Sequence, residues 1–238
     1  MSAAAAPFVL ILGMHRSGTS CLAGALELCG LFLGEVRRTG RHNPKGYFEP
    51  AELVRLHDHV LALNGGAWHR PPPRAEVHPV LRAQLHAFAE LLSARRPCGL
   101  KDPRLLLIDE WAEIPDAPVC SVGTFRHPLA VAASLEARNG LPVETGLALW
   151  LDYNQRLIER HRRAPFSLIA YDLSQPDRYR RALMAIAGEL GLRVPRWRLR
   201  RFVTRRLDHH AAATEIPAAC AEAYRYLLDH SLQAREAA

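Results

Sequence analysis

Residues 8–20 read FVLILGMHRSGTS, and this stretch predicts both the fold and the place of the functional site. The apolar run at residues 8–13 ends in glycine, and a helical pattern follows it directly over about residues 19–29. This order predicts a buried strand that leads into a helix. Gly13 and Gly18 have the spacing of a phosphate-binding loop, and their place between a strand and a helix makes that loose pattern credible.

The loop residues are of the kinds that hold a phosphate. Backbone N–H groups at the start of the helix, with its partial positive charge, attract anions, and Ser17, Thr19 and Ser20 can donate hydroxyl hydrogen bonds. His15 lies inside the loop, and we expect it to orient the loop rather than to transfer protons. The simpler alternative is an ordinary tight turn.

One residue of the loop limits the ligand. A P-loop nucleoside triphosphatase needs a lysine directly after the second glycine, but Thr19 stands there. The cation is displaced to Arg16, which suits a ligand with one terminal phosphate and an adjacent sulfate better than a magnesium triphosphate. A P-loop small-molecule kinase that uses ATP and magnesium remains the alternative.

The rest of the chain alternates between helical and strand-like patterns. Helices are predicted over about residues 49–63, 79–94, 104–113, 129–138 and 145–162, with a largely helical remainder, and strands at residues 119–125 and 166–171. Residues 98–101 are a short segment between two of these helices, to which no strand is assigned. This alternation indicates a mainly parallel sheet with helices on both faces. We expect one α/β domain of the P-loop type over residues 1–238.

Composition restricts the partners and the compartment. The net charge of +7 and the isoelectric point near 9.5 favour an anionic partner. The arginines of the carboxyl-terminal third have few aromatic residues among them, so a solvated basic face is favoured over a nucleic-acid surface. No apolar run is long enough to span a bilayer, and no lysine or arginine precedes the first one as a secretion signal requires. The five cysteines form no CxxC pair, so we expect a reducing cytoplasm and neither disulfides nor a zinc site.

Four short motifs together resemble the PAPS-dependent sulfotransferases, where PAPS is 3′-phosphoadenosine 5′-phosphosulfate. They are Arg16 to Thr19, Arg126 with Ser134 eight positions later, residues 43–49 (NPKGYFE) and residues 100–104 (LKDPR). The last two look like bacterial members, and the resemblance covers roughly residues 8–173. It implies transfer of the sulfuryl group of PAPS, without a metal, to a hydroxyl or amine of an unidentified acceptor. The residues that it implies for PAPS binding are His15, Arg16, Ser17, Gly18, Thr19, Ser20, Arg126 and Ser134.

The resemblance also assigns catalytic roles. Arg16 and Lys101 are the expected cations for the leaving group, although Lys101 could simply pair with Asp102 for structure. Glu49 is the expected base. The alternative is that its carboxylate only complements the dipole of the helix that it opens. His57, two turns further along the same predicted helix, is the second candidate base. The chain departs from the family in lacking an RKGxxG segment. Arg205, Arg206 and His209 are candidates to replace it, and plain surface charge is the alternative reading of these residues.

Overall fold

A four-stranded parallel sheet forms the centre of the molecule in the computed structural model, which describes residues 7–40, 45–204 and 215–235. The strands are β1 (Phe8–Leu12), β2 (Cys98–Lys101), β3 (Val119–Phe125) and β4 (Ser167–Ala170), in the order β2-β1-β3-β4. Leu10 lies opposite Leu100 on one side and Ser121 on the other. Because all pairs are parallel, the carboxyl ends of the strands lie along one edge.

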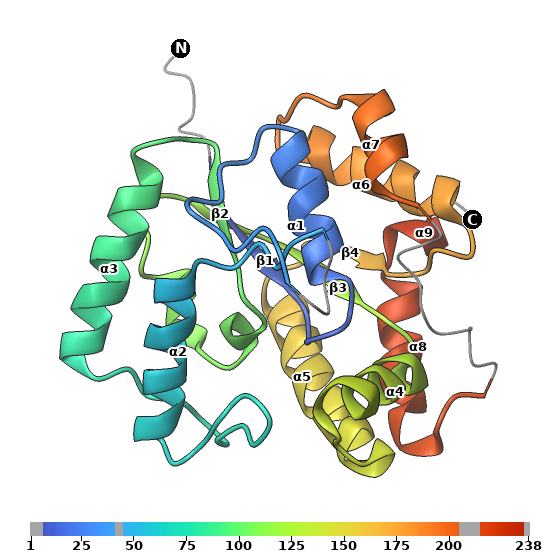
Figure 1. The fold of residues 1–238 in the computed structure, drawn as a ribbon, viewed down its shortest axis with the longest axis horizontal. Coiled ribbons are helices and arrows are strands. Elements are labelled where there is room, and N and C mark those ends of the chain that lie inside the picture. Colours follow the sequence, from blue (N-terminus) through green and yellow to red (C-terminus); the bar gives the residue numbers. More distant parts are fainter. Residues whose placement is uncertain (1–6, 41–44, 205–214, 236–238) are drawn as a thin grey trace.

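Helices cover both faces of this sheet (Figure 1). Along the chain they are α1 (Thr19–Leu28), α2 (Ala51–Leu63), α3 (Pro79–Ser93), the 3₁₀ turns η1 (Pro103–Leu106) and η2 (Asp109–Ala112), α4 (Pro128–Asn139), α5 (Val143–Arg163), α6 (Pro176–Glu189), α7 (Arg196–Phe202), α8 (Ala218–Asp229) and α9 (Leu232–Arg235). The predicted fold class, a parallel α/β domain, is confirmed.

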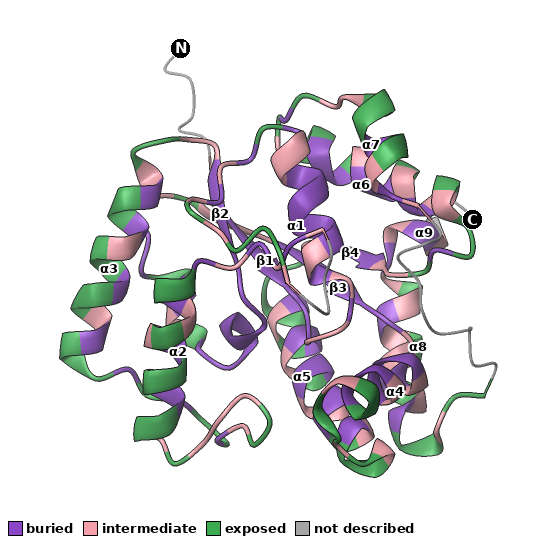
Figure 2. Ribbon diagram, viewed as in Figure 1, coloured by how far each residue is buried: buried purple, intermediate pink, exposed green. Residues whose placement is uncertain are grey.

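The pleat of β1 divides the core into two layers. Phe8, Leu10 and Leu12 pack with apolar side chains of α2, α3, α5 and α8. Val9 and Ile11 point to the other face and pack with α1, α6 and α7. All five residues of β1 are buried, and Figure 2 shows the strand in the colour of buried residues. A strand buried on both faces has a continuous apolar sequence, and this is why residues 8–12 were recognisable as a strand.

Three local predictions need correction. Residues 98–101 form a strand, although they include Gly99 and Lys101, because β1 supplies the hydrogen-bonding edge. Residues 104–113 form two 3₁₀ turns instead of a helix, with Ile108 extended between them. Glu49 does not open a helix, because Pro50 is the extended N-cap and α2 begins at Ala51. A residue before proline avoids the helical region, which places Glu49 in the preceding loop.

No helix in the described part of the chain is long and apolar enough to cross a membrane.

Candidate active site

The predicted phosphate loop connects β1 to α1 at the carboxyl edge of the sheet. Gly18 is the N-cap of α1 with φ of +84°, and a Cβ added to it would lie 2.2 Å from the Tyr171 ring. The hydroxyl of Thr124 on β3 donates to the Ser17 carbonyl at 3.0 Å and fixes the loop to the sheet. Because no side chain caps α1, its first N–H groups are left to face an anion.

Two backbone outliers mark this region. Among the described residues, Arg16 and Phe48 are the non-glycine residues with positive φ, at 66° and 57°. This region is costly for long or aromatic side chains, and such strain gathers at functional sites. Arg16 lies in the phosphate loop and Phe48 lies between Tyr47 and Glu49. One strained residue is therefore itself a predicted catalytic group, and the other directly precedes the predicted base Glu49.

Lys101 and Glu49 form an ion pair beside the phosphate loop. The Lys101 ammonium, whose side chain is only 3% exposed, also donates to the Ser20 hydroxyl and to the Tyr47 carbonyl, both at 3.2 Å. Ser20 in turn donates to the same carbonyl at 3.0 Å. The end of β2, the first turn of α1 and the loop before α2 thus meet at one point. Lys101 is paired with Glu49 and not with Asp102, so the purely structural pairing considered above does not occur.

The predicted nucleotide residues come together on the β3 side of the loop. Arg16 donates through Nε to the Ser134 hydroxyl at 2.7 Å. Arg126, at the end of β3, lies with its guanidinium 5.3 Å from the centroid of the Tyr171 ring, and its carbonyl accepts from Trp150 at 2.9 Å. Burial, followed by the charges of Arg138 and Arg126, lowers the pKa of Arg16 below its ordinary value. Such a concentration of positive charge favours an anion.

Arg138 belongs to this cation cluster, and the sequence reasoning missed it. It lies four residues beyond Ser134 on α4, so the two side chains share a face of the helix. Its guanidinium is 5.6 Å from the centroid of the Tyr47 ring, on the loop that carries Glu49. Among the described residues no carboxylate pairs with Arg138. Its position one turn after the serine of the Arg126–Ser134 motif was the available signal.

His15 packs against aromatic rings. Its ring centroid is 4.6 Å from that of Trp68 and 6.0 Å from that of Tyr153. Burial, followed by the charge of Arg104, lowers the pKa of His15 well below its ordinary value. Its Nε2 atom is buried and has no hydrogen-bond partner in the described part of the structure. A neutral imidazole wedged between the phosphate loop and Trp68 fits an orienting role.

His57 occupies a place that does not suit a base. Its side chain is fully buried, and its Nδ1 atom lies 2.7 Å from Asp102 Oδ2. Its Nε2 atom accepts from the Trp111 indole N–H at 2.7 Å. Both ring nitrogens are therefore occupied, and neither is open to an acceptor hydroxyl. The geometry argues against His57 as the proton acceptor and leaves Glu49.

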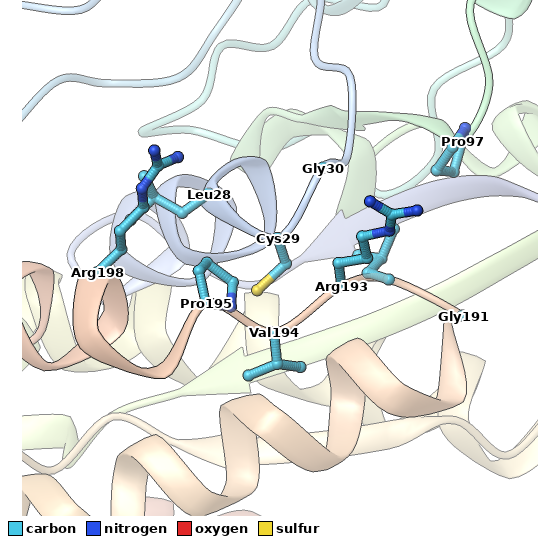
Figure 3. A pocket seen from close by; sticks show the side chains of 10 residues that line it. Leu28, Cys29, Gly30, Pro97, Gly191, Arg193, Val194, Pro195 and Arg198 are labelled. Carbon is cyan, nitrogen blue, oxygen red and sulfur yellow. The ribbon is translucent and has the colours of Figure 1, made fainter.

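A surface pocket of about 580 Å³ lies elsewhere in the molecule (Figure 3). It is lined by Cys29 and Gly30 after α1, Pro97 before β2, and residues 191–195 after α6. These segments stand at the amino edge of the parallel sheet, opposite the phosphate loop. The pocket is therefore separate from the candidate active site. Arg205, Arg206 and His209, considered as a replacement for the missing glycine-rich segment, lie outside the described residues.

Comparisons with known proteins show the fold. No family model matches the sequence, and no curated protein matches it. Among solved structures, the chain is similar to the sulfotransferase domain of the Synechococcus PCC 7002 olefin synthase, with a TM-score of 0.58 and 16% sequence identity. The match covers 92% of this chain and 94% of that domain. The chain thus has the fold of a sulfotransferase domain over nearly its whole length.

Proposed function

We propose that this protein is a sulfotransferase that moves the sulfuryl group of PAPS to a hydroxyl or amine of an acceptor. The observation that carries this proposal is the meeting of Lys101, Ser20 and Glu49 at the phosphate loop, with arginines on the opposite side of that loop. A cation and a carboxylate beside an anion site are the groups that sulfuryl transfer needs. The fold shared with a sulfotransferase domain supports the same activity.

The residues fit the two anionic ends of the nucleotide. The uncapped first turn of α1 and the Ser20 hydroxyl suit the 5′-phosphosulfate. Arg126, Ser134 and Arg138 suit the ribose 3′-phosphate, because guanidinium groups bind phosphate through charge-assisted hydrogen bonds. Arg16, which is bonded to Ser134 and belongs to the phosphate loop, connects the two positions.

Each catalytic residue then has one task. Bound PAPS would supply the sulfuryl group, whose sulfur forms a bond to the acceptor oxygen or nitrogen while its bond to the 5′-phosphate oxygen breaks. Glu49 takes the acceptor proton. Lys101 stabilises the negative charge that develops on the leaving phosphate oxygen, and Ser20 holds the ammonium toward the phosphate loop. A buried ammonium acts strongly here, because water does not screen its charge.

The kinase alternative fits less well. A P-loop kinase carries its lysine within the loop, whereas the buried lysine at this site comes from the end of β2 and is paired with Glu49. Thr19 fills the place of the kinase lysine. The arginines at the ends of β3 and α4 favour a ligand with a second, separate phosphate.

Thermal unfolding with different nucleotides tests the proposal. We expect 3′-phosphoadenosine 5′-phosphate, the nucleotide product, to stabilise the protein equally with magnesium and with a chelator. A ligand at one hundred times its dissociation constant adds roughly 2.7 kcal/mol to the free energy of unfolding. Stabilisation by ATP with magnesium alone would support the kinase instead. Transfer of labelled sulfate from PAPS to a panel of acceptors then identifies the acceptor.

A further inference from the structure

A chain of buried polar contacts lies directly behind Lys101. Trp111 donates to His57, and His57 Nδ1 contacts Asp102. Asp102 Oδ1 accepts from the backbone N–H of Arg104 at 3.1 Å and from its guanidinium at 3.0 Å. The same guanidinium binds both carboxylate oxygens of Asp58, at 2.6 and 3.2 Å. Every contact is at hydrogen-bonding distance, and the network runs from the buried Trp111 to Asp58, whose side chain is 48% exposed.

The donor of Trp111 fixes the form of His57. An indole N–H can only donate, so His57 Nε2 must be the unprotonated nitrogen. His57 Nδ1 therefore carries the hydrogen and donates it to Asp102. Burial alone would raise the pKa of Asp102, but the hydrogen bond from His57 and the charge of Arg104 together hold that pKa well below its ordinary value. The network thus contains a neutral imidazole and an ionised Asp102.

This network joins the two segments that carry the proposed catalytic pair. Asp102 directly follows Lys101 at the end of β2. His57 and Asp58 belong to α2, which begins two residues after Glu49. Trp111 holds the other side of His57 from η2 and is itself fully buried. These contacts therefore fix the end of β2, which carries Lys101, relative to α2, which follows Glu49.

We propose that His57 and Trp111 are positioning residues, which hold Lys101 against Ser20 and Glu49 through Asp102. The effect on catalysis rests on the proposed sulfuryl transfer, but the positioning of Lys101 does not. A catalytic group displaced by about 1 Å can cost on the order of 10²-fold in rate, so a distant hydrogen bond of this kind can control turnover.

The position of the Lys101 side chain can be followed directly by NMR, because Lys45 and Lys101 are the only lysines in the sequence. Protein with lysine labelled with ¹³C at Cε alone gives one signal for each lysine, and Lys45→Arg assigns the one from Lys101. We expect His57→Leu to shift and broaden the Lys101 signal. His57→Asn should keep the native signal, because its amide N–H can replace Nδ1 as the donor to Asp102. The matched control is His59→Leu, an exposed position on the same helix, which should change nothing.

Enzyme assays give the second readout. His57→Leu should lower PAPS turnover on the order of 10²-fold with the affinity for 3′-phosphoadenosine 5′-phosphate unchanged, and His57→Asn should restore turnover to within about 3-fold. If His57→Leu does not fold, Trp111→Phe removes the indole donor together with part of the ring volume, keeps an aromatic ring in the core, and should give a smaller Lys101 shift. A native Lys101 signal in folded His57→Leu or Trp111→Phe overturns the inference. If the wild type binds no 3′-phosphorylated nucleotide, the proposed function fails, while the lysine signals still decide the positioning.

Discussion

Arg138 is the residue whose role changes most between sequence and structure. It lies one helical turn beyond Ser134, its charge helps to lower the pKa of Arg16, and it pairs with no carboxylate among the described residues. We predict that Arg138→Ala weakens binding of 3′-phosphoadenosine 5′-phosphate about 10- to 100-fold, since a hydrogen bond to a charged group contributes about 1.5–3 kcal/mol. Titration calorimetry measures the change.

Arg37 provides the matched control for this prediction. Its guanidinium also stacks on Tyr47, 4.9 Å from the ring centroid, but the residue is exposed and is not among the charges that act on Arg16. Arg37→Ala removes the same charge from the same aromatic ring and should leave the affinity within about 2-fold. Equal losses in the two variants would mean that only the general positive charge matters.

Glu49 and Lys101 have separable roles at the same contact. Glu49→Gln keeps the shape of the side chain and removes its basicity, so turnover should fall by about 10²–10⁴-fold with nucleotide affinity intact. Lys101→Met should cost about 10²–10³-fold, as the loss of one preorganised donor does. Steady-state turnover beside nucleotide titration checks both. Near-normal turnover of Glu49→Gln would remove Glu49 from the role of base, and the burial of His57 would then leave the base unassigned.

At the scale of elements, the phosphate loop depends on a glycine that contacts a neighbouring strand end. Gly18 has φ of +84°, and a Cβ there would lie 2.2 Å from Tyr171. Gly140, which ends α4, has φ of +67° with open space around it. Both positions disfavour a side chain by conformation, but only Gly18 adds a clash. Gly18→Ala should therefore lower the melting temperature clearly more than Gly140→Ala, and only Gly18→Ala should lose nucleotide binding.

The elements that were predictable are those whose own sequence determines them. Residues 8–12 are a continuous apolar run, residues 119–125 begin and end with apolar residues, and the two-glycine loop follows the first strand directly. The strand at residues 98–101 is short and has Gly99 and Lys101 within it, so only its pairing with β1 makes it a strand. Residues 104–113 have helical spacing, but Arg104 is drawn toward Asp102 and Asp58. The contact with Asp58 joins residues 46 positions apart and cannot be predicted from a local pattern.

The sequence predicted most of the residues that form the candidate site, but it did not predict which side chains contact one another. The motifs gave Arg16, Glu49, Lys101 and Ser134, and the structure brings them to one edge of the sheet. That His57 faces Trp111 and Asp102 depends on η2 and on the end of β2, which are more than forty positions away in the chain. A helical spacing of two turns predicted that His57 could share a side with Glu49. It could not show that this side is the core.

At the scale of the whole molecule, the parallel sheet gathers positive charge at one edge. The ends of β2 and β3, the phosphate loop and the last turn of α4 supply Lys101, Arg126, Arg16 and Arg138. Their mutual repulsion opposes folding, and a bound anion relieves it. Protonation of His15, in the phosphate loop, would add a further positive charge at this edge. The protonation of His15 is therefore coupled to the stability of the fold.

The last prediction concerns that histidine and acid. Burial and the charge of Arg104 lower the folded-state pKa of His15, whereas an unfolded chain has a histidine pKa near 6.5. Between these two values the unfolded state binds more protons, so the free energy of unfolding falls as the pH drops below about 6.5. The slope contributed by His15 approaches about 1.4 kcal/mol per pH unit at most. Urea unfolding at several pH values measures it. His15→Gln should flatten the slope and exposed His59→Gln should not, so an unchanged slope in His15→Gln would show that the acid sensitivity arises elsewhere.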